Sequence, residues 1–124
     1  MSVGPNWHVT FCIMTCGRIP YLKRCLLSIR KYCPIRYSIK ILSQGPASKE
    51  LIELLAELDD DIELVISPVN LGFGGGRRLL SQKVTSNLVM MMDDDLYLTE
   101  GAIAHALRAF EQDYRIGAVS MPLY

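Results

Sequence analysis

The sequence predicts an α/β fold: a three-layer α/β/α sandwich around a mostly parallel, Rossmann-like sheet. Three observations predict it. Apolar runs of strand length alternate with stretches of helical period along the whole chain. The length of 124 residues suits one domain, and no linker or internal repeat divides residues 1–124. Half of the residues are hydrophobic and 21% are charged, which is a globular composition.

Five segments predict strands because they are rich in β-branched, aromatic or other large apolar residues. They cover residues 8–14, 37–42, 62–67, 87–92 and 116–121. A helical segment stands between each strand and the next, so we expect parallel strands, right-handed crossovers and helices on both faces of the sheet.

Four segments predict helices. The first covers residues 19–33, with Pro20 in its first turn and Pro34 ending it. Ser48 is placed to cap the second helix. The third is expected near residues 75–85, after a glycine-rich loop, and the fourth runs from a cap at Thr99 to about residue 113. Their apolar stripes are Leu22, Cys25, Leu26 and Ile29; Leu51, Ile52, Leu54, Leu55 and Leu58; and Ile103, Ala106, Leu107 and Phe110.

Composition excludes several classes of function. The formal net charge is zero, which argues against a nucleic-acid partner. No apolar run approaches the roughly 20 residues of a membrane span, and no signal peptide is recognised, so we expect a cytoplasmic protein. The four cysteines have no C-x-x-C spacing, which favours free thiols over a zinc site.

Two acidic triplets lie on opposite sides of predicted strands. Asp59, Asp60 and Asp61 precede the third strand and are expected to form a solvated turn, whereas Asp93 and Asp95 follow the fourth. Ligands of open parallel sheets bind beyond the carboxyl ends of the strands. In an extended segment Asp93 and Asp95 would point the same way and repel each other unless a hard cation, Mg²⁺ or Mn²⁺, lay between them. The alternative is an exposed acidic turn.

A glycine-rich loop, NLGFGGGRR, covers residues 70–78. Glycines allow a backbone to approach a ligand closely. The loop is similar to a dinucleotide-binding fingerprint, but Arg77 stands where the third glycine belongs, and no Gly-Lys-Ser/Thr follows as in a phosphate-binding P-loop. Taken alone, the loop is equally compatible with a flexible or close-packed turn.

Four segments in order resemble family 2 glycosyltransferases of the GT-A fold, over residues 8 to about 121. They are VTFCIMTCGRIPYLKRCLLSI, NLGFGGGRR, LVMMMDDDLYLTEGAI and YRIGAVSMPLY. The first is similar to the family's opening strand, turn and helix, and the third to its D-x-D strand end. The resemblance implies a nucleotide-diphosphate sugar donor, with a UDP-sugar as the first expectation, and inverting transfer of the sugar to an unknown acceptor hydroxyl.

The resemblance also implies roles for individual residues. Asp93 and Asp95 would hold the divalent metal. The donor would be bound by Thr15, Arg18, Ser43, Gln44, Asn70, Gly72, Arg77 and Asp94. No residue matches the catalytic base, which stays unknown.

Two departures from the family pattern leave other functions open. Ser43 and Gln44 stand where the family has an acid pair that recognises the base, so preference for uracil is in doubt. Residues 1–124 also match only the nucleotide-sugar-binding portion of the family, a truncated GT-A fold without the acceptor-binding half. The alternatives are a degenerate or fragmentary nucleotide-binding module, metal-dependent nucleotide hydrolysis and, less favoured by the loop, a nicotinamide-dependent oxidoreductase. An uncovered sheet edge would favour a homodimer.

Overall fold

The computed structural model describes residues 6–58 and 61–121, which form four strands and four helices in strict alternation. The elements are β1 (His8–Thr15), α1 (Ile19–Tyr32), β2 (Arg36–Gln44), α2 (Lys49–Leu58), β3 (Ile62–Ser67), α3 (Gly72–Ser81), β4 (Leu88–Asp93) and α4 (Ala102–Gln112). The predicted α/β class is therefore confirmed, and the first four predicted strands lie within two residues of the observed bounds.

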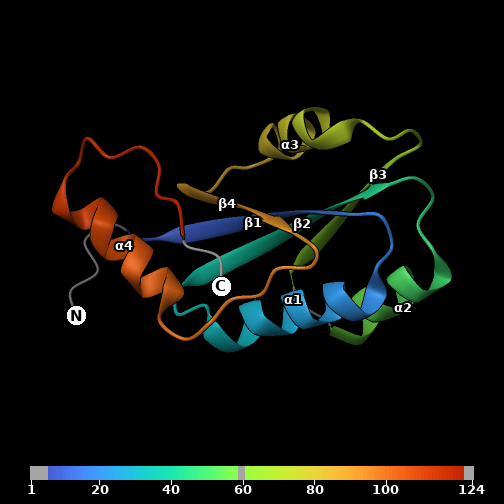
Figure 1. Cartoon of the computed structure of the whole chain (residues 1–124), viewed down its shortest axis with the longest axis horizontal. Coiled ribbons are helices and arrows are strands. Elements are labelled where there is room, and N and C mark those ends of the chain that lie inside the picture. Colours follow the sequence, from blue (N-terminus) through green and yellow to red (C-terminus); the bar gives the residue numbers. More distant parts are fainter. Residues whose placement is uncertain (1–5, 59–60, 122–124) are drawn as a thin grey trace.

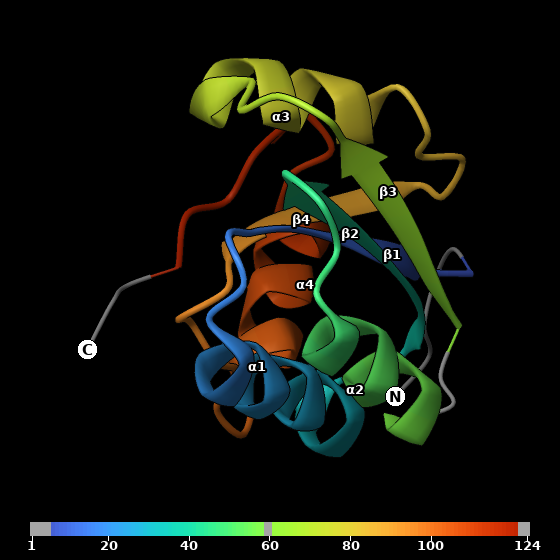
Figure 2. The same ribbon diagram turned by 90° about the vertical axis from the view of Figure 1, so that its right-hand side faces the viewer.

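The sheet is parallel throughout, with strand order β3-β2-β1-β4. The chain adds β2 and β3 on one side of β1 and then returns to place β4 on the other side. Helices α1, α2 and α4 cover one face of the sheet, and α3 covers the other (Figures 1 and 2). These are the three predicted layers, and the reversal of strand order puts a topological switch point between β1 and β4.

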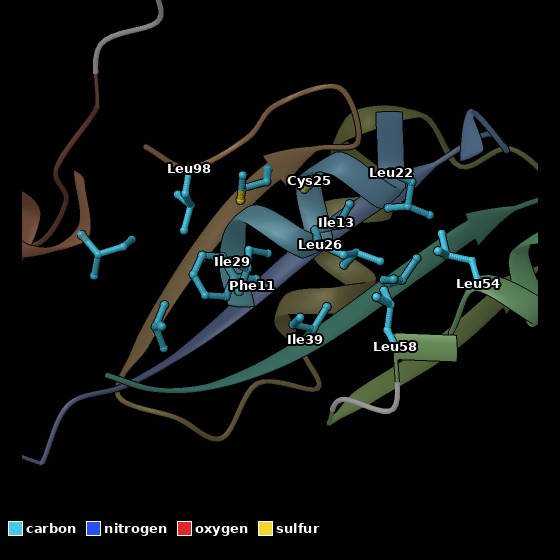
Figure 3. Close-up of a cluster of buried hydrophobic side chains, with 14 of the residues drawn as sticks. Phe11, Ile13, Leu22, Cys25, Leu26, Ile29, Ile39, Leu54, Leu58 and Leu98 are labelled. Atoms are coloured by element: carbon cyan, nitrogen blue, oxygen red, sulfur yellow. The ribbon is translucent and has the colours of Figure 1, made fainter. Parts of the chain in front are cut away.

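The larger core lies between the sheet and the three helices on one face. Figure 3 shows Phe11, Ile13 and Ile39 of the sheet packing against helical residues that include Leu26 and Leu54. All four residues predicted to line α1 are buried. In α2, Leu51, Leu54 and Leu58 are buried, but Ile52 is 55% exposed, so its predicted place in the apolar stripe is wrong. Ile52 lies one position beyond Leu51, on the side of α2 that turns away from the sheet.

A smaller core lies beneath α3, where Cys12, Met14 and Leu42 of the sheet meet Leu80. The predicted helix near residues 75–85 is wrong in its bounds, because α3 begins at Gly72 and ends at Ser81. The glycines are thus not a loop before the helix: they form its first turns. Gly76 faces the sheet, and the absence of a side chain there lets α3 lie close to β1 and β2.

Helix starts agree with the sequence in one case and differ in another. The Ser48 hydroxyl accepts the backbone N–H of Leu51 at 3.1 Å, so this cap is confirmed. The predicted cap at Thr99 is wrong. Helix α4 begins after Gly101, whose φ of 82° is left-handed, and no side chain caps it. A glycine takes this conformation at little cost, which moves the helix start two residues along the chain.

The predicted strand at residues 116–121 is also wrong, because these residues form no strand. Strand-forming residues need a neighbouring strand to supply hydrogen bonds, and residues 116–121 pair with none of the strands in the described part of the chain. Strand β4 is consequently an edge of the described sheet.

Candidate functional site

Most of the predicted site residues lie at the carboxyl ends of the parallel strands, which all meet on one side of the sheet. Thr15 ends β1, Ser43 and Gln44 end β2, and Asp93 ends β4. Asn70 lies between β3 and α3, and Gly72 begins α3, so both follow the carboxyl end of β3 and lie on the same side of the sheet. Asp61 precedes β3 and therefore lies on the opposite side, where the strands begin. Asp59 and Asp60 of the first triplet lie outside the described residues.

A buried carboxylate joins β1 to β4 at the topological switch point. Asp94 is 1% exposed and accepts a hydrogen bond from the Thr15 hydroxyl at 2.8 Å. It also accepts one from Arg18 Nη2. That hydrogen bond, with the nearby charge, raises the pKa of the Arg18 guanidinium further above its usual value, so the cation is permanent. The three side chains fix a positive charge above the ends of two strands.

The outer two carboxylates of the triplet flank this buried pair. Asp93 Oδ1 lies 4.0 Å from Arg77 Nη2 of α3, and Asp95 Oδ2 lies 3.6 Å from Arg18 Nη1. Their side chains are 41% and 46% exposed. Both carboxylates therefore reach solvent at the end of β4, one toward each helical layer.

The expectation that Asp93 and Asp95 point the same way along an extended segment is wrong in its premise. The strand ends at Asp93, and Asp94 and Asp95 form a turn in which the N–H of Leu96 donates to the Asp93 carbonyl at 3.2 Å. A turn ends the two-residue alternation of side chains. The turn is also what buries Asp94, the middle acid, between Thr15 and Arg18.

Gln44 links β2 to the start of α3. Its Oε1 accepts the backbone N–H of Leu71 at 2.6 Å, and its Nε2 donates to the Gly72 carbonyl at 3.4 Å. Asn70 Oδ1 accepts the N–H of Gly72 at 2.8 Å, and Gly72 has a left-handed φ of 71°. These three residues hold the glycine segment in place. No local pattern indicates this contact, because Gln44 is 27 residues from Leu71 and 28 residues from Gly72 along the chain.

A cleft of about 560 Å³ opens beside the Arg18 cation, between the start of α1 and the start of α2. Three of the residues that the resemblance assigns to the donor line it: Arg18, Ser43 and Gln44. The other lining residues were not expected from the sequence; they are Cys16, Gly17, Ile19, Pro20, Tyr21, Pro46, Ser48, Glu50 and Leu51. Most of these residues follow the carboxyl ends of β1 and β2, and this position is the feature of the sequence that could have identified them.

The comparisons with known proteins establish the family. The family model described as glycosyl transferase family 2 matches residues 10–123. The chain belongs to this family. No curated protein sequence matches it.

Solved structures show the same fold at low sequence identity. Staphylococcus aureus TarS (residues 1–349) superposes with a TM-score of 0.72 and 12% identity, over 94% of this chain and 38% of that one. The mannosyltransferase PcManGT from Pyrobaculum calidifontis, solved with GDP-Man and Mn²⁺, gives a TM-score of 0.70 and 18% identity, over 82% of this chain and 32% of that one. The chain thus spans about a third of each of these structures, and its sheet and helices match a part of the GT-A fold.

No group of three or more metal-ligating side chains occurs among residues 6–58 and 61–121. In the same residues, no helix is long and apolar enough to cross a membrane. The cytoplasmic location stays a prediction.

Proposed function

We propose that this chain binds a nucleotide-diphosphate sugar through a divalent cation, as the donor half of an inverting glycosyltransferase. The observation that carries the proposal is the arrangement at the switch point: a fixed guanidinium, two exposed carboxylates and an adjoining cleft. Membership of glycosyl transferase family 2 and the fold shared with a mannosyltransferase in complex with GDP-Man and Mn²⁺ support it.

The residues at the end of β4 fit a hard divalent cation. Asp93 and Asp95 offer carboxylate oxygens, the ligands that Mg²⁺ and Mn²⁺ prefer. Each is half-exposed and touches an arginine only at ion-pair distance, so each keeps oxygens for a metal. Two carboxylates are an incomplete coordination set, and the donor's phosphate oxygens would complete it. When bound, the metal would neutralise charge on the departing diphosphate.

The other residues have positioning and binding roles in this proposal. Asp94 and Thr15 hold Arg18 at the mouth of the cleft, where its guanidinium can pair with a phosphate. Arg77 approaches the Asp93 carboxylate from α3 and would add positive charge beside the diphosphate. Asn70 and Gly72 shape the start of α3, and Ser43 and Gln44 line the cleft.

The role of the outer carboxylates can be tested by calorimetry with GDP and UDP, with and without Mn²⁺. We expect binding to require the metal. Replacement Asp95→Asn should weaken it at least about tenfold, because one metal ligand loses its charge. The matched control is Asp61→Asn, since Asp61 belongs to the first triplet and lies at the opposite edge of the sheet. Equal weakening by both substitutions, or binding without metal, would contradict the proposal.

A second candidate function is a nucleotide-binding module without transfer activity of its own. The observation that favours it is Gln44, which replaces a base-reading acid and is engaged with backbone groups of residues 71 and 72. A turnover assay with labelled nucleotide-sugars and simple glycan acceptors separates the two functions. Acceptor-dependent product that disappears in Asp95→Ala would support transfer, and its absence alongside metal-dependent donor binding would support the module.

A homodimer remains a proposal as well. It is supported by the position of β4 at the edge of the described sheet and by Val89, which is 49% exposed. Light scattering on the purified chain would decide between monomer and dimer.

A further inference from the structure

The cleft beside Arg18 extends away from the acidic triplet, and this direction matters if the proposed function holds. Arg18 contacts residues that follow β4, whereas Ser48 and Glu50 belong to the start of α2, which follows β2. Two strand spacings separate β4 from β2, roughly 10 Å. A diphosphate at Arg18 would therefore leave its ribose and base to extend toward α2.

Three polar side chains of the cleft form hydrogen bonds with the protein's own backbone. Ser43 Oγ donates to the Gly45 carbonyl at 3.0 Å. The Gln44 amide uses both its oxygen and its nitrogen on residues 71 and 72. Ser48 Oγ accepts from Leu51 N–H, which leaves its own O–H free to donate. Gln44, the residue that replaces the family's base-reading acid, is thus poorly placed to read a base.

Glu50 is the one acidic side chain among the residues that line the cleft. It lines the cleft, it is exposed, and among residues 6–58 and 61–121 it makes no hydrogen bond or ion pair. It lies in the first turn of α2, beside the positive N-terminus of that helix. The cleft therefore offers one carboxylate with two acceptor oxygens, and beside it one hydroxyl donor at Ser48.

We propose that Glu50 reads the nucleobase of the donor and selects guanine. The Watson–Crick edge of guanine presents the O6 acceptor followed by two adjacent N–H donors, on N1 and N2. The two oxygens of the Glu50 carboxylate match those two donors, and the free O–H of Ser48 matches O6. The donor is then a GDP-sugar, and this replaces the UDP-sugar expected from the resemblance.

The other bases fit a carboxylate less well. Uracil presents one N–H between two carbonyl oxygens, so the second carboxylate oxygen would face an acceptor and be repelled. Cytosine and adenine each present one amino group beside a ring nitrogen acceptor. A site with a lone carboxylate therefore discriminates by repulsion as well as by attraction.

The experiment compares GDP, UDP, CDP and ADP by calorimetry in the presence of Mn²⁺. We expect GDP to bind about 10- to 100-fold more tightly than the others, the range of a charge-assisted hydrogen bond. Glu50→Gln should remove most of this preference by weakening GDP while leaving UDP unchanged. Glu53→Gln is the matched control: it lies one turn further along α2, pairs with Lys49 and does not line the cleft.

The outcomes separate the base assignment from the proposed function. Metal-dependent binding with equal affinity for GDP and UDP would overturn the role of Glu50 and leave the proposed function standing. Equal weakening by Glu50→Gln and Glu53→Gln would also overturn it, since general charge would then explain the effect. If no nucleoside diphosphate binds to the folded wild-type chain, both the role of Glu50 and the proposed function are contradicted. Thermal melting of each variant checks folding, which an exposed residue should not disturb.

Discussion

Asp94 illustrates how a buried side chain can hold a charged neighbour in place. It is buried, yet its two oxygens have partners in Thr15 and Arg18. A buried carboxylate is tolerated only when it is paired and hydrogen-bonded. The pair also restricts the long Arg18 side chain, which otherwise would lose freedom when it bound a phosphate. The middle acid of the triplet therefore stabilises the fold and positions the cation, while the outer two face solvent.

Replacement Asp94→Asn should lower the free energy of unfolding by about 1–3 kcal/mol, because it removes a charge-assisted hydrogen bond from a buried site. Partial exposure of Arg18 keeps the loss below that of a fully buried ion pair. Denaturant unfolding measures the change. Asp95→Asn is the control and should shift stability by less than about 1 kcal/mol, since its pair with Arg18 is exposed. Comparable losses in both variants would contradict the assigned roles.

Helix α3 owes its position to glycine. A Cβ at Gly76 would overlap the Met14 sulfur and lie 3.1 Å from Leu42 Cδ2, while a Cβ at Gly74 would meet nothing within 4 Å. The two glycines thus occur in one helix, two residues apart, with opposite surroundings. Gly76 sets the distance between α3 and the sheet, and through it the position of Arg77 next to Asp93.

Gly76→Ala should destabilise the protein by about 1–3 kcal/mol, as expected for overpacking of a close contact. Gly74→Ala should instead stabilise it by up to about 1 kcal/mol, because alanine is the better helix former and the site is open. Thermal melting of both variants measures these shifts. The assignment of the glycines to the helix rather than to a loop would be refuted if Gly74→Ala destabilised the protein as much as Gly76→Ala.

At the scale of the whole molecule, the two cores on opposite faces of the sheet each bury a free thiol. Burial raises the pKa of Cys12, beneath α3, to about 11 and that of Cys25, on the buried face of α1, to about 12. All four cysteines are free, as the sequence predicted. In the unfolded chain these thiols would ionise near their ordinary pKa, so the folded state retains protons that the unfolded state loses.

Stability should therefore be unaffected by these thiols below about pH 8.5 and should fall as the pH rises toward the folded-state values. Each thiol contributes a slope of up to about 1.4 kcal/mol per pH unit. Denaturant unfolding from pH 8 to 11 in the presence of a reductant measures the slope. Cys25→Ala should flatten it, and the exposed Cys16→Ser should not. An unchanged slope in Cys25→Ala would mean that its thiol already ionises in the folded protein.

Local patterns in the sequence determined most of the fold. The apolar stripe of α1 and the length of β3 follow from the spacing of side chains in regular structure, which depends only on neighbours along the chain. Strand polarity then placed Asp93 and Asp95 at the edge where ligands bind and Asp61 at the other. The four segments that resemble family 2 glycosyltransferases added the family, which the match over residues 10–123 confirms.

Contacts between distant segments decided the rest. The burial of Asp94 depends on Thr15 and Arg18, 79 and 76 residues away, and the engagement of Gln44 depends on backbone groups of α3 and the residue before it. The need for glycine at position 76 comes from Met14 and Leu42 of the sheet, which leave no room for a side chain beneath α3. Residues 116–121 have strand-forming composition but no strand beside them to pair with. In each case the stability of the local conformation depends on a partner that only folding brings near, so no local sequence pattern could encode that conformation.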